Sequence, residues 1–245
     1  MTGEFAIEFG PRSQDELLAG AMTSSWVAGS TITGISVTVD AGAKTYTRAA
    51  GDFTADVEVG DLVRFPDLTG NNSKPFIATA VSALVITGAA IQYALTDESA
   101  VTTDLVVADK LETGNLCKTY SVLTWLRGTC DTPDSYLLTK GVEITGFTIE
   151  QAVNAMVTGS FPIIGRSQEV LSTYPAGSTF PSGAKRDPFS SVDVSAFNGT
   201  APLKLIDTFT ISNDNGGSAQ FALGDAGVAF VERGKAANTF SLAFL

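Results

Sequence analysis

The sequence opens with an alternation of apolar and acidic positions that predicts a half-buried strand. In the segment EFAIEF, Phe5, Ile7 and Phe9 fall on one face, and Glu4 and Glu8 fall on the other. Because the side chains of a strand point alternately to its two faces, one face would pack on a core and the other would meet water.

The next segment, SQDELLAGAM, predicts a short helix. Ser13 and Glu16 have the spacing of a capping box, and the acidic residues of the first turn suit the positive end of the helix dipole. Leu17, Leu18 and Ala21 recur at helical spacing, so the helix would bury one side. We find no second segment with this pattern.

From about Thr31 onward the sequence has the pattern of a β protein. Runs rich in Thr, Val and Ile are separated by Gly, Asn and Asp about every 8 to 12 residues, the spacing of a sandwich or a small barrel. A second series of such runs begins near Lys118. We therefore predict an all-β protein with one short flanking helix. Residues 31–113 have enough strands for a small core of their own, and the Pro- and Gly-rich stretch from Phe161 to Gly199 predicts a long irregular loop.

The segment from Val142 to Ile164 predicts a hairpin with one apolar face and one small, polar and acidic face. The apolar positions shift by one across Thr145 and Gly146, which indicates a β-bulge. The polar face would carry Glu143, Thr148, Glu150, Asn154, Thr158 and Ser160. On the pattern alone, an ordinary hairpin with one side in water explains these positions equally well.

The charge of the chain narrows the functions that it can have. It holds 15 Lys and Arg residues against 26 Asp and Glu residues, a formal net charge of −11, and it has no His. Without imidazole, a Ser-His-Asp or Cys-His couple and a histidine-ligated metal site are excluded. An acidic surface disfavours nucleic-acid binding, which depends on Lys and Arg, but DNA could pass along an acidic wall without being held.

Other candidate sites in the sequence are weak. The cluster SNDNGG, residues 212–217, lacks the spacing of an EF-hand loop, and Asn215 with Gly216 is typical of a hairpin turn. Trp26 and Trp125 lie in apolar patterns that favour core packing over sugar stacking, which speaks against a glycosidase. We expect no enzyme activity, no cofactor and no metal.

Two features bear on the compartment of the protein. Cys117 and Cys130 are either reduced thiols, the interpretation that we prefer, or the ends of a short disulfide loop. The most apolar stretch, from Val81 to Leu95, is too short and too interrupted to span a bilayer, and the N-terminus does not have the pattern of a signal peptide. We expect a protein made in a cytoplasm, with no membrane partner.

The order of elements resembles that of the major tail tube protein of phages with long, flexible, non-contractile tails. The resemblance rests on an N-terminal strand and helix ending in a Trp (FAIEF, SQDELLAGAMTSSW), an inserted β module, and the later runs KTYSVLTWLRG, YLLTKGVEITGFTIEQAVNAMVTGSFPIIG and IDTFTISNDNGG. The insert, GDFTADVEVGDLVRF followed by NNSKPFIATAVSALVIT, is similar to the small barrel that interrupts some members of that family.

The resemblance implies a structural protein of the siphophage virion, made in the cytoplasm of a bacterial host and located in the phage tail. Residues 1–30 and 114–245 would form a discontinuous tube-forming β-sandwich, and residues 31–113 a small β-barrel on the tube exterior. Rings of six copies would stack into a conduit for DNA ejection, lined by the polar positions of the predicted hairpin. The implied partners are further copies of the chain, the tape measure protein and the tail-end proteins, while DNA would pass without specific binding.

Two alternatives remain open from the sequence. The first is a secreted or virion-surface β module that binds carbohydrate, although exposed loop aromatics and a cleavable signal are not evident. The second is the tube of a contractile injection system, against which the inserted module speaks mildly.

Overall fold

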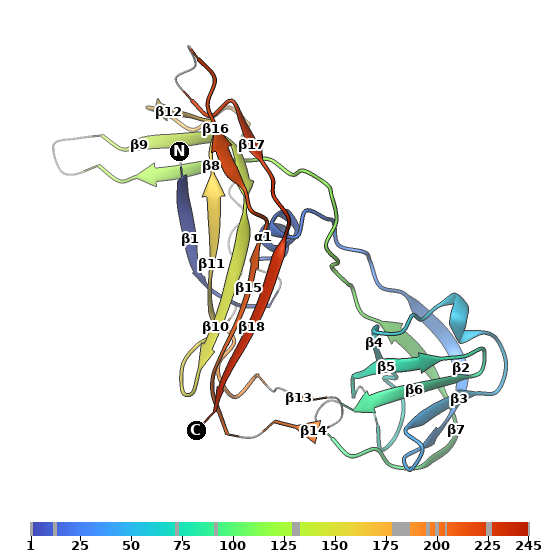
Figure 1. The fold of residues 1–245 in the computed structure, drawn as a ribbon. Coiled ribbons are helices and arrows are strands. Elements are labelled where there is room, and N and C mark those ends of the chain that lie inside the picture. Colours follow the sequence, from blue (N-terminus) through green and yellow to red (C-terminus); the bar gives the residue numbers. More distant parts are fainter. Residues whose placement is uncertain are drawn as a thin grey trace. The chain divides into compact units, whose positions relative to one another are not determined.

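The chain folds into two compact units, which we call the sheet unit and the barrel unit. The computed structural model describes residues 2–11, 14–71, 74–90, 93–128, 133–177, 187–194, 197–198, 201–203, 205–223 and 227–244. The sheet unit comprises Met1–Ser25, Glu112–Val194 and Leu205–Leu245, and the barrel unit comprises Trp26–Leu111 and Ser195–Lys204. Both units consist mainly of strands, with one short α-helix (Figure 1), so the prediction of an all-β protein is confirmed.

Six strands of the barrel unit close into a barrel in the order β2-β3-β6-β5-β4-β7. Their bounds are β2 Thr31–Asp40, β3 Thr45–Arg48, β4 Leu62–Arg64, β5 Phe76–Val81, β6 Val85–Ala90 and β7 Glu98–Val107, and a 3₁₀ turn spans Phe53–Ala55. In the core, the ring of Tyr46 stacks on those of Phe76 and Phe65, with centroid distances of 4.1 and 5.1 Å. Because this sheet closes on itself, it has no open strand edge.

The sheet unit is built on an antiparallel sheet in which five neighbouring strands follow the order β1-β11-β10-β15-β18. β9 continues the sheet beside the end of β11 and itself pairs with β8 and β12. The bounds are β1 Thr2–Glu8, α1 Asp15–Ala21, β8 Tyr120–Leu126, β9 Ser135–Ile144, β10 Gly146–Ala152, β11 Thr158–Ile164, β12 Ser167–Leu171, β15 Ile206–Asp214, β16 Ser218–Gln220, β17 Phe230–Glu232 and β18 Ala237–Phe244. Two short strands of the barrel unit, β13 Phe197–Asn198 and β14 Ala201–Pro202, pair with each other in a separate sheet.

The loop predicted from Phe161 to Gly199 begins later than expected. Phe161 and Ile164 belong to β11 and are buried, and β12 follows after a short turn. The prediction was wrong for this first part because Pro162 sits inside β11, where it pairs with Glu4 of β1. Residues 178–186 of the predicted loop lie outside the described residues.

The helix α1 packs against β9 and β10, and a glycine allows a close approach to β8. A Cβ on Gly20 would lie 2.7 Å from the Tyr120 hydroxyl oxygen, so a larger residue would not fit there. That hydroxyl donates a hydrogen bond to the carbonyl oxygen of Glu16 at 2.9 Å. The N-cap of the helix is Gln14, and Ser13 of the predicted capping box lies outside the described residues.

The core of the sheet unit is formed by α1 and by the alternate apolar residues of the strands. Its buried members are Phe9, Ala21, Ile144, Val157 and Phe161, with Phe5, Ile7, Leu17, Leu18, Phe147 and Ile149 packed around them. The apolar faces predicted for the first strand, the helix and the later hairpin therefore meet in one cluster.

An interruption at Thr145 divides one predicted strand into β9 and β10. The Thr145 N–H still donates to the carbonyl oxygen of Pro162 at 2.9 Å, so both strands keep β11 as their neighbour. A Cβ on Gly146 would lie only 2.2 Å from the carbonyl oxygen of Asn213 in β15, which explains the glycine at this point. The interruption separates Glu143 from the polar positions that follow it.

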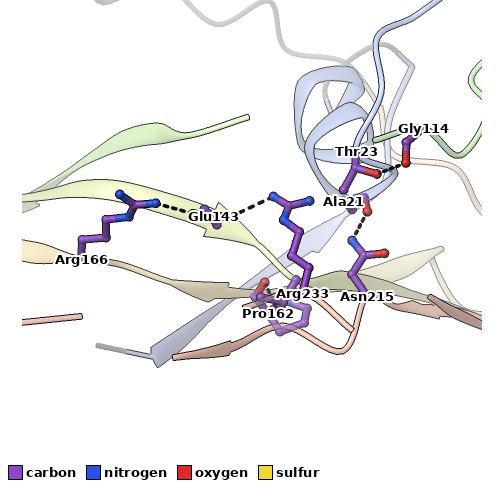
Figure 2. Close-up of polar contacts among 9 residues, drawn as sticks. Ala21, Thr23, Gly114, Glu143, Pro162, Arg166, Asn215 and Arg233 are labelled. Carbon is purple, nitrogen blue, oxygen red and sulfur yellow. Dashed lines mark hydrogen bonds and ion pairs between the residues drawn. The ribbon is translucent and has the colours of Figure 1, made fainter. Parts of the chain in front are cut away.

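Glu143 is buried in the sheet unit, where two arginines pair with its carboxylate (Figure 2). Glu143 is 4% exposed. One of its carboxylate oxygens accepts a hydrogen bond from Arg166 and the other accepts one from Arg233, each at 3.0 Å. The expectation that Glu143 points into water is therefore wrong. A buried carboxylate costs several kcal/mol unless cations and hydrogen bonds compensate it, and here two guanidinium groups do so.

These arginines make Glu143 the buried centre of a triad that joins three segments. Arg166 lies in the turn between β11 and β12, and Arg233 directly follows β17, so the triad ties both segments to β9. Two further hydrogen bonds hold the end of α1 (Figure 2): Asn215 Nδ2 donates to Ala21 O, and Thr23 Oγ1 donates to Gly114 O at 2.6 Å.

Because each unit has its own core, we expect a large-to-small substitution in one unit to leave the other folded. Phe76→Ala should destabilise the barrel unit, and Phe161→Ala the sheet unit, each by about 3–5 kcal/mol. Hydrogen exchange measured peptide by peptide should show faster exchange in the substituted unit alone. The control Val59→Ala, at a position that is 66% exposed, should change stability by less than about 0.5 kcal/mol. Faster exchange throughout both units would contradict the expectation.

The triad should stabilise the sheet unit measurably. We expect Glu143→Gln to lower the free energy of unfolding by about 1–3 kcal/mol, because both guanidinium groups lose their charged acceptor. The matched control is Glu169→Gln, whose ion pair with Lys140 is about half exposed and should be worth less than about 1 kcal/mol. Urea unfolding checks both values, and equal losses would show that burial does not strengthen the triad.

Candidate functional site

One face of the five-stranded sheet carries two aligned rows of small and acidic side chains. The first row runs through Ala6, Ser160, Thr148, Ser212 and Thr239. The second row runs through Glu8, Thr158, Glu150, Thr210 and Ser241. Aligned positions of an antiparallel sheet point to the same face, so the ten side chains form one surface without a basic residue, which we call the polar face.

The opposite side of the same strands is apolar. The row between the two polar rows runs through Ile7, Gly159, Ile149, Ile211 and Phe240. Ile7 and Ile149 pack on the core described above, and Gly159 makes room for the ring of Phe9, which a Cβ would meet at 2.2 Å. The five strands therefore have one polar side and one apolar side.

A hollow of about 560 Å³ lies on the polar face, over β1, β10 and β11. Three carboxylates line it, those of Glu4, Glu8 and Glu150, together with Thr148, Thr158 and other small residues. No Lys or Arg is among the residues that line it. An anion would find no cation here, so the surface is unsuited to holding phosphate.

The structure brings four of the six predicted site residues together. Thr148, Glu150, Thr158 and Ser160 lie on the polar face and line the hollow. Asn154 lies in the loop between β10 and β11, with a φ of 59°, and its N–H donates to Ser191 Oγ at 3.2 Å. Glu143 is buried and paired with Arg166 and Arg233, and it is not among the residues that line the hollow.

Sequence reasoning missed the part of the polar face that other segments contribute. Glu4 and Glu8 were placed on the polar side of their strand, but nothing in the sequence joined that strand to the predicted hairpin. The remaining members come from β15 and β18: Thr210, Ser212, Thr239 and Ser241. The alternation in IDTFTISND and NTFSLAFL is the signal that could have found them.

Both outer strands of this sheet have an unpaired edge. Within the described residues, β1 pairs only with β11 and β18 pairs only with β15. Close to the open edge of β18, Ile211, Phe240 and Phe244 are 36%, 61% and 57% exposed on the apolar side. An unpaired edge beside exposed aromatic residues is typical of a surface that another chain covers.

Neither tryptophan that was expected in the core is buried. Trp26 is 37% exposed and Trp125 is 52% exposed, so the expectation of core packing is wrong for both residues. The guanidinium of Arg127 lies over the Trp125 ring at 5.3 Å, and Trp125 Nε1 donates to Asp134 at 2.9 Å. These two contacts place the Trp125 ring beside the ends of β8 and β9.

The other sequence candidates also keep simple structural roles. Gly216 has a φ of 61°, as a turn requires, but β15 before it pairs with β18 rather than with β16, so the turn does not close a hairpin. Among the described residues, no group of three or more acidic or cysteine side chains is placed to hold a metal ion. Cys117 is exposed, and Cys130 lies outside the described residues.

Comparison with known proteins agrees with this geometry. No helix in the described part of the chain is long and apolar enough to cross a membrane. A search of curated proteins finds no match to the sequence. The family model described as phage tail tube protein matches residues 1–245. The chain therefore belongs to the phage tail tube protein family, whose members are structural components of the virion tail.

Proposed function

We propose that this protein is the major tail tube subunit of a siphophage, that six copies close into a ring, and that stacked rings form the conduit for ejected DNA. Family membership supports the structural role in the tail, which needs no catalytic activity. The finer proposal rests on one observation: a polar face without basic residues lies on a sheet with unpaired edges on both sides.

A ring would complete the sheet without changing the single copy. Unpaired strand edges expose backbone donors and acceptors, and a closed barrel removes them. If neighbouring copies join edge to edge, the sheets merge into one barrel around a channel. The polar face then points to the channel, and the apolar side faces α1 and the core.

The lumen lining in this proposal follows the polar face. Thr148, Glu150, Thr158 and Ser160 remain members, and Glu8 joins them from β1. Asn154 would lie beyond the strand ends, in the β10–β11 loop. Glu143 takes no part, because its carboxylate is engaged by two arginines inside the unit.

A wall of this composition lets DNA pass without holding it. Duplex DNA carries about one charge per 1.7 Å, and it adheres to proteins mainly through Lys and Arg. Repetition of Glu8 and Glu150 around the ring would produce circles of carboxylates, separated by small hydroxyl and methyl groups. The resulting repulsion would keep the backbone phosphates away from the wall.

The barrel unit fits the exterior of the tube in this proposal. Its six-stranded barrel has no strand edge to contribute to a shared sheet, since these strands already close. Its position outside would also leave the lumen free. The tape measure protein inside the tube and the tail-end proteins at its tips are the further partners that we propose.

Assembly can be tested directly with purified protein. At high concentration we expect tubes of sixfold symmetry in electron micrographs, because ring closure pairs both open edges of every copy. Deletion of residues 31–107, closed with a short linker, should leave tube formation intact, since the sheet unit keeps its own core. A protein that stays monomeric in vitro and is absent from virion tubes would overturn the proposed function.

The charge of the lumen can be tested by substitution. Glu150→Lys or Thr158→Lys should leave tubes intact, because both positions are exposed on the polar face, but DNA ejection should become slower as phosphates bind the new cations. Added salt should reduce the defect by screening. The matched control Ala80→Lys adds the same charge as Thr158→Lys at an exposed position of the barrel unit and should not slow ejection. An unchanged rate of DNA ejection with Glu150→Lys would contradict the assignment of the polar face to the lumen.

A further inference from the structure

We propose that neighbouring copies in the ring are joined by a parallel strand pair, with β18 of one copy lying beside β1 of the next. The inference rests on the ring of the proposed function and adds which edges meet and in which direction. Three observations carry it: the number of strands in the sheet, the match of side chains at its two edges, and the exposed aromatic residues of β18.

The direction of the pair follows from the number of strands. All neighbours along β1-β11-β10-β15-β18 are antiparallel, so strand direction alternates over five strands, and β1 and β18 point the same way. Rotation about the axis of a cyclic ring preserves strand direction relative to that axis. The last strand of one copy must therefore meet the first strand of the next as a parallel pair, whatever the number of copies.

The side chains at the two edges match on both faces. On the polar face, β1 presents Glu4, Ala6 and Glu8, and β18 presents Thr239, Ser241 and Ala243. On the apolar face, β1 presents Phe5 and Ile7, and β18 presents Phe240, Leu242 and Phe244. Because both strands have the same period of two residues, joining them continues the wet and the dry side across the seam.

The exposed aromatic residues identify a second copy as the occupant of the β18 edge. Phe240 and Phe244 are more than half exposed, although they lie on the side that forms the core in the neighbouring strands. Large apolar side chains left exposed on one side of a sheet are typical of a surface that needs apolar cover from another chain. These two rings would pack beside Phe5 and Ile7 of the next copy and supply that cover.

Distance makes a cross-link between these two strands specific for neighbouring copies. Within one copy, three strands separate β1 from β18, which corresponds to roughly 19 Å at about 4.8 Å per strand spacing. A disulfide requires Cα atoms within about 7 Å of each other. A disulfide between β1 and β18 therefore forms only across a seam between copies.

The test is a set of paired cysteines in the full chain carrying Cys117→Ser and Cys130→Ser. Each variant combines one substitution in β1 with one in β18, and the positions are Glu4→Cys, Ala6→Cys, Glu8→Cys, Thr239→Cys, Ser241→Cys and Ala243→Cys. Assembled tubes are oxidised and run on a denaturing gel without reductant. In a parallel seam, both strands run the same way, so a higher-numbered position on β1 should cross-link most strongly with a higher-numbered position on β18. The gel should then show covalent oligomers of increasing size, up to the closed ring.

The crossed combinations serve as controls within the same set. If the higher-numbered positions on β1 instead cross-link most strongly with the lower-numbered positions on β18, the seam is antiparallel and the inference is overturned. Tubes that form without any β1–β18 cross-link would overturn the seam and leave the proposed function standing. Absence of tubes in the cysteine-free parent and in the unsubstituted protein, together with absence of the protein from virion tubes, would overturn the proposed function itself. The same cross-links in dilute, unassembled protein, where no seam exists, would also overturn the inference.

Discussion

The pairing of β11 with three other strands is the interaction on which the sheet unit depends. β11 pairs with β1 over its whole length, with β10 at its start and with β9 at its end. A slip of one residue would turn Phe161 to the polar face and bring Ser160 into the core. Phe161 is fully buried, and Gly159 leaves the space that the Phe9 ring occupies, so the core tolerates one register only.

Once that register is fixed, the faces of the other strands follow. In a single copy, residues of α1 cover the apolar side chains of β1, β10 and β11. On the same side of the sheet, Ile211 of β15 and Phe240 and Phe244 of β18 remain exposed. Buried polar contacts strengthen the covered part. The Glu143 triad and the hydrogen bond from Asn215 to Ala21 tie the strand connections to the core. In the proposed ring, the next copy would cover the exposed part.

The two units of the chain deal with strand edges in opposite ways. The barrel unit closes six strands around Tyr46, Phe65 and Phe76, and these strands leave no edge for another chain. The sheet unit keeps two edges open, and exposed aromatic residues lie beside the edge of β18. In the proposed tube, the sheet unit therefore forms the shared wall and the barrel unit takes no part in it.

Local periodicities could be read from the sequence alone. A period of two predicted strands and the polar positions Thr148, Glu150, Thr158 and Ser160, and helical spacing predicted the short helix, because these periods are properties of residues close together in the chain. The sequence did not reveal that Glu143 is buried, since its partners Arg166 and Arg233 lie 23 and 90 residues away along the chain.

The order of the strands in the sheet became known only from the tertiary structure. It joined Glu8 of the first strand to Glu150 through β11, extended the polar face over β15 and β18, and placed Asn154 in a loop. It also left β1 and β18 as the outer strands with the same direction. Strand order and register depend on packing between distant segments, and a pattern along one segment contains no information about its neighbours across the sheet.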